Sequence, residues 1–175
     1  MSIPFLSLCE QTAGLKAEVL AAIGEVLDTQ GFANGPAVAA FESQLAGVLG
    51  IREVVALNSG TSALHAALLC AGVGPGDEVV TVAHTWISTV WAISYVGATP
   101  VFVDVDPATS GMDPAQVERA LTSRTRAILP VHLYGQPVEL DPLLELGRRR
   151  ARAASCASSV SSAPPSPKAP RFFPG

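Results

Sequence analysis

Three small polar residues, Ser59, Gly60 and Thr61, occupy the part of this sequence best suited to binding an anion. They follow the short apolar run 54–57, which is typical of a strand buried in a parallel sheet. An Ala/Leu-rich pattern typical of a helix then extends from 61 to 70. A helix that begins here would direct free backbone N–H groups and the positive end of its dipole toward one point. This geometry suits a phosphate group.

Each residue of this turn could contribute to such a site. Gly60 has no side chain, so a ligand could approach the backbone closely. The hydroxyls of Ser59, Thr61 and Ser62 could act as donors. The alternative is an ordinary strand-to-helix turn in which a Ser or Thr caps the helix and no ligand is needed. The residues of this stretch alone leave both interpretations open.

Other residues capable of chemistry are dispersed along the chain. His65, His84 and His132 lack the spacing of metal ligands, so we expect no metal site. Asp104 and Asp106 lie close together, and paired carboxylates can perform acid–base chemistry. Because a proline follows the second of them, we interpret this pair as part of a turn and assign it no catalytic role.

The elements that must position these residues alternate between strand and helix patterns. Apolar residues at helical spacing predict helices over 14–30, 36–49, 61–70, 85–96 and 114–121, and one that begins at Asp141. Apolar runs predict strands over 54–57, 78–82, 101–105 and 126–131. Such alternation predicts an α/β fold with a mostly parallel sheet flanked by helices. The glycines near Gly72 follow a helix and precede a strand, the wrong order for a dinucleotide-binding loop.

Composition and charge limit the possible functions. The chain has 175 residues, 49% of them apolar and with a net charge of −4, which suffices for one domain with a core. Residues 1–147 contain all 15 acidic residues and five basic ones, so this part is acidic and unsuited to nucleic acids.

No stretch is apolar enough to span a membrane. The start lacks the features of a signal peptide, and three scattered cysteines fit a reduced protein, so we expect a cytoplasmic location.

The composition changes at residue 148. Residues 148–175 contain six basic and no acidic residues, and Arg, Ala, Ser and Pro dominate. Such a segment buries little apolar surface, so we expect a disordered basic tail after a domain that covers 1–147.

Five segments in the first 147 residues resemble, in order and spacing, the sugar aminotransferases of the DegT/StrS type. They are 58–64, 76–79, 85–89, 97–106 and 130–137. These fold-type-I enzymes use pyridoxal 5′-phosphate (PLP) to aminate keto sugars attached to nucleotides. The resemblance implies an incomplete large domain, because the family's sheet has seven strands and the sequence predicts about four.

The resemblance also implies site residues and partners. Ser59, Gly60 and Thr61 would hold the phosphate of PLP, and Trp86 would stack on its pyridine ring. Judged by its own surroundings, Trp86 would more readily be a core residue, and we interpret Trp91 as one. The implied partners are a nucleotide-sugar, an amino-acid donor such as glutamate, and a second copy of the chain in a homodimer. Tyr134 and Gln136 could border the site, and the sequence leaves this open.

Two groups that the family's chemistry needs do not occur at matching positions. The family uses a lysine that forms a Schiff base with PLP and an aspartate at the pyridine nitrogen. The lysines of this chain are Lys16 and Lys168, and no acidic residue follows Glu145. We therefore assign no catalytic residue and expect an inactive chain. The tail's composition suggests a shift of reading frame near Arg149. The alternatives are a non-catalytic remnant that binds phosphate or PLP and a generic nucleotide-binding α/β domain.

Overall fold

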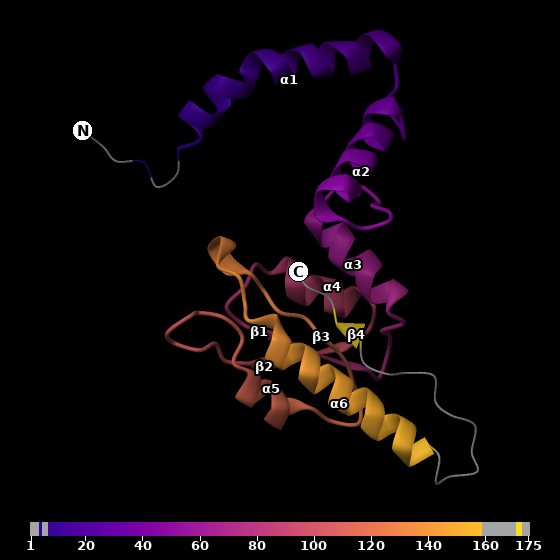
Figure 1. The fold of residues 1–175 in the computed structure, drawn as a ribbon, viewed down its shortest axis with the longest axis vertical. Helices are drawn as coiled ribbons and strands as arrows, with labels where there is room; N and C mark the ends of the chain where they lie inside the picture. The colour runs from indigo at the N-terminus through magenta and orange to yellow at the C-terminus, as the bar shows by residue number, and fades with distance from the viewer. Residues whose placement is uncertain (1–3, 5–6, 159–170, 173–175) are drawn as a thin grey trace. The chain divides into compact units, whose positions relative to one another are not determined.

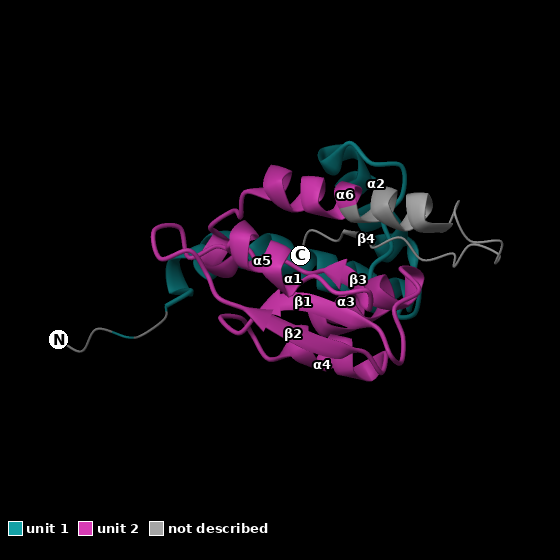
Figure 2. Ribbon diagram, turned by 90° about the horizontal axis from the view of Figure 1, so that it is seen from below, with its two compact units in different colours: residues 1–56 teal, residues 57–175 magenta. Residues whose placement is uncertain are grey.

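A computed structural model describes residues 4, 7–158 and 171–172. It divides into two compact units, residues 1–56 and 57–175, which are described separately (Figure 2). Among the described residues no helix is both long enough and apolar enough to cross a bilayer.

The first unit consists of two helices, α1 (Cys9–Thr29) and α2 (Pro36–Leu49). Pro36 occupies the first turn of α2, where its missing N–H is not needed. Gly35 is required just before it, because an added Cβ would lie 2.2 Å from the Gly31 carbonyl oxygen. The Glu42 carboxylate accepts a hydrogen bond of 2.8 Å from the Ala56 N–H and so holds the end of the unit against α2.

The run 54–57 does not form a strand, so this prediction from the sequence is wrong. Val55 is 77% exposed and Leu57 is 48% exposed. A buried strand needs neighbours that accept its hydrogen bonds and cover its faces. No strand among the described residues pairs with this segment.

The second unit is built on a parallel sheet with the strand order β2-β1-β3-β4 (Figure 1). The strands are β1 (Glu78–Val82), β2 (Thr99–Val103), β3 (Thr125–Ile128) and the two-residue β4 (Arg171–Phe172). β1 pairs in parallel with both β2 and β3, and β3 pairs in parallel with β4. The expected α/β class with a mostly parallel sheet is confirmed.

Helices cover both faces of this sheet, and two apolar clusters hold them there. Side chains of successive strand residues point to opposite faces, so Val79 contacts one cluster and Val80 the other. One cluster joins the sheet to α3 (Gly60–Cys70) and α4 (Ser88–Tyr95), through Leu68, Ala71, Ala92, Ile93 and Val96. The other joins it to α5 (Pro114–Ala120) and α6 (Leu140–Ser158), through Val117, Leu143 and Leu146. Figure 2 shows α6 and α4 on opposite sides of the sheet.

Three helix details differ from the sequence-based expectations. α4 begins at Ser88 rather than at Thr85. Trp91 is 46% exposed and is therefore not a core residue, because α4 turns Ala92 and Ile93 toward the sheet instead. α6 continues to Ser158, past the change in composition at residue 148. Much of the tail for which we expect disorder, residues 159–170 and 173–175, lies outside the described residues.

Candidate functional site

The strand order creates a crevice at the carboxyl ends of β1 and β3. After β1 the chain enters α4 on one face of the sheet, and after β3 it enters α6 on the other face. Adjacent parallel strands whose connections diverge in this way leave a crevice between them, which is where open α/β sheets bind ligands. A cavity of about 740 Å³ lies there, within the usual size range of ligand sites. Its lining comes from the start of α3 and from the segments 85–89 and 129–134.

The start of α3 supplies backbone donors to this cavity. Ser59 caps the helix, and its side-chain oxygen accepts a hydrogen bond of 3.1 Å from the Ser62 N–H. The Ala63 N–H donates to the Ser59 carbonyl oxygen at 3.0 Å, as expected for the first helical bond. The N–H groups of Gly60 and Thr61 come before these positions and have no acceptor within the helix. The cap that the sequence offered as an alternative therefore leaves two donors available.

Gly60 and Thr61 both line the cavity, whereas Ser59 lies beside it as the cap. A Cβ added to Gly60 would meet no atom within 4 Å, so its backbone borders open space. This space lets an anion reach the first N–H groups of the helix.

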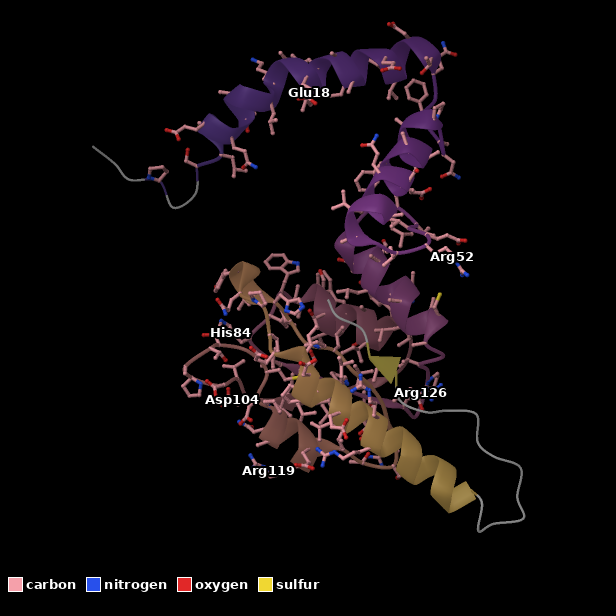
Figure 3. The ribbon with its side chains drawn as sticks, in the orientation of Figure 1. Glu18, Arg52, His84, Asp104, Arg119 and Arg126 are labelled. Atoms are coloured by element: carbon pink, nitrogen blue, oxygen red, sulfur yellow. The ribbon has the colours of Figure 1, made fainter. Side chains whose placement is uncertain are left out.

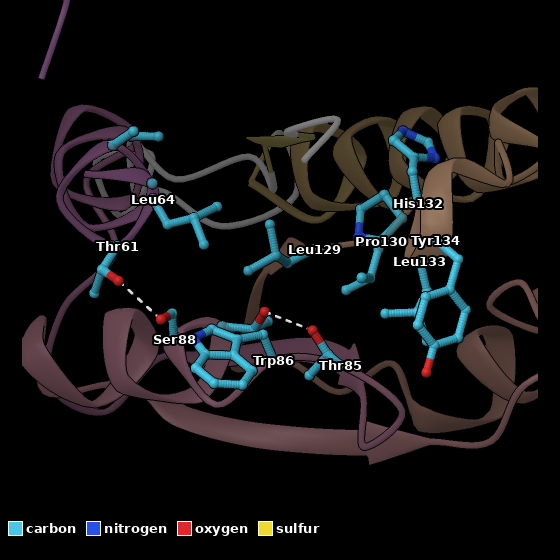
Figure 4. Close-up of a pocket in the computed structure, with 15 residues that line it drawn as sticks. Thr61, Leu64, Thr85, Trp86, Ser88, Leu129, Pro130, His132, Leu133 and Tyr134 are labelled. Atoms are coloured by element: carbon cyan, nitrogen blue, oxygen red, sulfur yellow. Dashed lines mark hydrogen bonds between the residues drawn. The ribbon is translucent and has the colours of Figure 1, made fainter. Parts of the chain in front are cut away.

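Trp86 presents an exposed aromatic face to the same cavity. Its side chain is 74% exposed, which excludes the core position that the residues alone favoured. The Thr89 N–H donates to the Trp86 carbonyl oxygen at 3.1 Å and fixes the backbone just before α4. In the view of Figure 4, the indole lies between Thr61 and Tyr134.

Two pairs of hydroxyl groups lie along the wall of the cavity. The Thr61 hydroxyl donates to the Ser88 hydroxyl at 2.8 Å, and Thr85 and Thr89 share a hydrogen bond of the same length (Figure 4). Ser88 and Thr89 are cavity residues that the sequence pattern alone does not identify. One sequence feature could have indicated them: small hydroxyl residues follow a buried strand, at the edge of a parallel sheet where ligands bind.

A buried threonine holds the segment after β3 against β1. The Thr81 side chain is fully buried and donates to the Leu129 carbonyl oxygen at 2.9 Å. The Leu129 N–H donates to the Val80 carbonyl oxygen at 2.8 Å. Together these bonds fix the chain where it leaves the sheet and begins to line the cavity.

The far rim of the cavity carries a second exposed aromatic residue. Tyr134 is 92% exposed, and its φ of 55° lies in the left-handed region that non-glycine residues rarely adopt. Its ring packs edge to face on His84, with 6.2 Å between the ring centroids. His132 accepts a hydrogen bond of 3.0 Å from the Val138 N–H through Nδ1, which closes the loop that carries Tyr134.

Among the described residues that line the cavity, none carries a Lys, Arg, Asp or Glu side chain. The charged groups of the sheet lie at its other end, where Glu78 begins β1 and forms an ion pair with Arg124. The Thr122 hydroxyl donates to the Glu78 carboxylate. This bond and the nearby Arg124 guanidinium lower the pKa of Glu78, and they outweigh the burial of the carboxyl, which raises that pKa. Figure 3 shows Arg126, near the start of β3, well separated from His84, which follows β1.

The remaining candidates are structural. The Asp106 carboxylate accepts hydrogen bonds from the N–H groups of Ala108 and Thr109, at 2.7 and 3.1 Å, as expected for a turn. Among the residues that the structure describes, no three His, Cys, Asp or Glu side chains gather as metal ligands would.

Comparison with known proteins identifies the family to which this fold and cavity belong. The sequence profile of the DegT/DnrJ/EryC1/StrS aminotransferase family matches residues 14–151. The chain belongs to this family. Its members depend on PLP, and the expected cofactor class is confirmed at that level.

Three relatives illustrate the match. The dTDP-3-amino-3,4,6-trideoxy-alpha-D-glucose transaminase of Streptomyces venezuelae is 46% identical over 147 residues, which are 84% of this chain and 39% of that protein. The GDP-perosamine synthase of Caulobacter vibrioides is 46% identical over 126 residues, 71% of this chain and 34% of that protein. The crystal structure of NtdA from Bacillus subtilis with bound cofactor PMP aligns with a TM-score of 0.81 at 37% identity, over 85% of this chain and 34% of that one. The chain thus spans between a third and two fifths of the length of these relatives.

The residues at the cavity suit the phosphorylated cofactor of the DegT/DnrJ/EryC1/StrS family. The space beside Gly60 is open to an anion, and the N–H groups of Gly60 and Thr61 form a neutral donor pair for a phosphate. The exposed face of Trp86 suits a flat conjugated ring.

Proposed function

We propose that the second unit of this chain binds PLP, with the phosphate at the start of α3 and the ring against Trp86. The observation that carries this proposal is that Gly60 and Thr61, at the start of α3, and an exposed Trp86 from a separate segment line one cavity. When bound, PLP supplies a conjugated ring that accepts electrons while an amino group is transferred. The residues of this chain would bind the phosphate, set the plane of the ring and exclude water from one side of it.

We propose that the reaction of the whole protein aminates a nucleotide-linked keto sugar. The names of the two relatives from Streptomyces and Caulobacter support a nucleotide-sugar as the substrate. An amino acid such as glutamate as the donor rests on the family resemblance alone.

We further propose that these 175 residues bind the cofactor without turning it over. None of the described residues that line the cavity is a lysine; Lys16 belongs to α1 of the first unit, and Lys168 lies outside the described residues. A shift of reading frame near Arg149 would account for the basic composition that follows. Resequencing the coding DNA through and beyond this point tests that explanation.

Titration with PLP, monitored by tryptophan fluorescence, tests the binding proposal. The chain has two tryptophans, and Trp91→Phe leaves Trp86 as the reporter. We expect PLP to quench Trp91→Phe strongly and Trp86→Phe weakly. We also expect NAD to have little effect, which separates PLP binding from a generic nucleotide site. Equal quenching in the two variants would contradict the proposal.

Reduction with borohydride tests whether the cofactor forms a covalent bond with the chain. We expect mass spectrometry to find no cofactor adduct on Lys16 or Lys168 at stoichiometric PLP. A stable adduct on either lysine would refute the proposal that the chain lacks a functional equivalent of the family's lysine.

We propose that a second copy of the chain covers apolar surface of the first unit. No residue of α1 or α2 is buried, and Ile23, Leu27 and Phe32 are each at least half exposed. Apolar surface of this kind marks an interface. Light scattering coupled to size exclusion should give the mass of a dimer, and a monodisperse monomer at micromolar concentration would contradict this.

A further inference from the structure

The hydrogen bond between Thr61 and Ser88 joins two helices at the wall of the cavity. Thr61 is the second residue of α3, and Ser88 is the first residue of α4, 27 positions later. Ser88 is only 8% exposed, and both residues line the cavity. The Thr61 hydroxyl donates this bond at 2.8 Å, and among the described residues none accepts a bond from the hydroxyl of Ser88.

The direction of this bond matters for an anion. While Thr61 donates to Ser88, the Thr61 oxygen offers only lone pairs to the cavity, and these repel a phosphate. A hydroxyl rotates to suit its surroundings, and the two oxygens can keep the same separation if Ser88 becomes the donor. Thr61 can then give its proton to the anion while it accepts one from Ser88.

We propose that Ser88 is a positioning residue for the phosphate site. By donating to the Thr61 oxygen, it orients the Thr61 O–H toward the bound phosphate and strengthens that bond through the chain of hydroxyls. Ser88 acts through Thr61 and does not itself contact the anion. This inference rests on the proposed binding of PLP at the start of α3.

The second hydroxyl pair of the same wall provides a matched comparison. Thr85 and Thr89 also share a hydrogen bond of 2.8 Å, and Thr89 is 5% exposed. Neither residue belongs to α3, so this pair does not bear on the donors at the helix start. A role limited to packing predicts similar effects for both pairs, whereas a positioning role predicts an effect of Ser88 alone.

The experiment compares the affinities of pyridoxine 5′-phosphate and pyridoxine, which differ by the phosphate and carry no aldehyde that could react with lysines. The variants are Ser88→Ala, Ser88→Thr and Thr89→Val, each in the full chain and checked for folding by circular dichroism. We expect Ser88→Ala to weaken binding of pyridoxine 5′-phosphate about twofold to tenfold, the typical effect of losing one hydrogen bond between neutral groups, with pyridoxine unaffected. Ser88→Thr restores a hydroxyl and should recover most of the affinity, and Thr89→Val should leave the preference for the phosphorylated compound unchanged.

A double-mutant cycle then tests whether Ser88 acts through Thr61. In a Thr61→Val background, Ser88→Ala should have no further effect on phosphate-dependent affinity, because the residue it orients is gone. Additive losses would overturn the proposal. If Ser88→Ala does not fold, Ser88→Cys replaces it, since its thiol has nearly the same size but is a weak donor.

Two outcomes separate this inference from the proposed function. If the unaltered chain binds neither pyridoxine 5′-phosphate nor inorganic phosphate, the proposed function fails and the inference fails with it. If the unaltered chain prefers the phosphorylated compound and Ser88→Ala keeps that preference in full, the inference alone is wrong.

Discussion

Replacement of Gly60 by alanine should change stability and cofactor affinity in opposite directions. Gly60 is the first residue of α3, its φ is not in the left-handed region, and an added Cβ meets no atom within 4 Å. Alanine therefore fits without strain and restricts the unfolded chain more than glycine does. We expect Gly60→Ala to stabilise the ligand-free chain by about 0.4–1 kcal/mol, a rise of about 1–4 °C in the unfolding midpoint.

The same methyl group should interfere with the phosphate. It would occupy the open space through which an anion reaches the N–H groups of Gly60 and Thr61. A hydrogen bond to a charged group contributes about 1.5–3 kcal/mol. Loss of one such bond raises the dissociation constant of PLP by about tenfold to a hundredfold.

Thermal unfolding and fluorescence titration measure the two effects on the same samples. Gly47→Ala is the matched control, because Gly47 lies within α2 and a Cβ there also meets nothing within 4 Å. The control should gain stability and keep its affinity for PLP. Wild-type affinity in Gly60→Ala would refute the assignment of the phosphate to the start of α3.

Two further predictions concern the sheet that supports the cavity. The bonds from Thr122 and Arg124 lower the pKa of the Glu78 carboxyl in the folded chain. The ionised carboxyl therefore stabilises the fold above the pKa that Glu78 has in the unfolded chain. This stabilisation is lost as the pH falls through the lower pKa of Glu78 in the folded chain. We expect Glu78→Gln to be less stable than wild type at pH 7, with a difference that shrinks below about pH 4 in thermal unfolding at several pH values. A constant difference across that range would contradict this. Thr81→Val leaves the buried Leu129 carbonyl oxygen without its side-chain donor, so we expect a loss of about 1–3 kcal/mol in denaturant unfolding, and a change within error would show that the bond contributes little.

The parts of the fold that depend on local pattern could be predicted from the sequence. The strand over 78–82 has the predicted bounds, because a short run rich in valine follows the Pro75–Gly76 turn, and the structure buries all five of its residues. The start of α3 was found through its small polar residues. The segment 54–57 has a similar apolar pattern, but strand formation depends on neighbours that a local pattern does not reveal.

The site was predictable only where the residues that form it are close in sequence. Ser59, Gly60 and Thr61 share one turn, and the role of Trp86 came from the resemblance rather than from its surroundings. Ser88 was missed because its importance lies in a bond to a residue 27 positions away. Of the segment 129–134 only Tyr134 was considered for the site, because the approach of the other residues to the cavity follows from the strand order, with β3 beside β1.

The described residues that line the cavity carry no charged side chain, and this determines how strongly each donor of the proposed site matters. An arginine or lysine at the phosphate would supply most of the attraction and would conceal the loss of a single hydroxyl. In the proposed site the attraction comes from the dipole of α3, two N–H groups and the Thr61 hydroxyl that Ser88 contacts. These groups are neutral and act over short distances, so their effect depends on geometry more than on ionic strength. A methyl group at Gly60 and a missing hydroxyl at Ser88 therefore perturb the same small set of donors, and each should be measurable in the affinity for the phosphate.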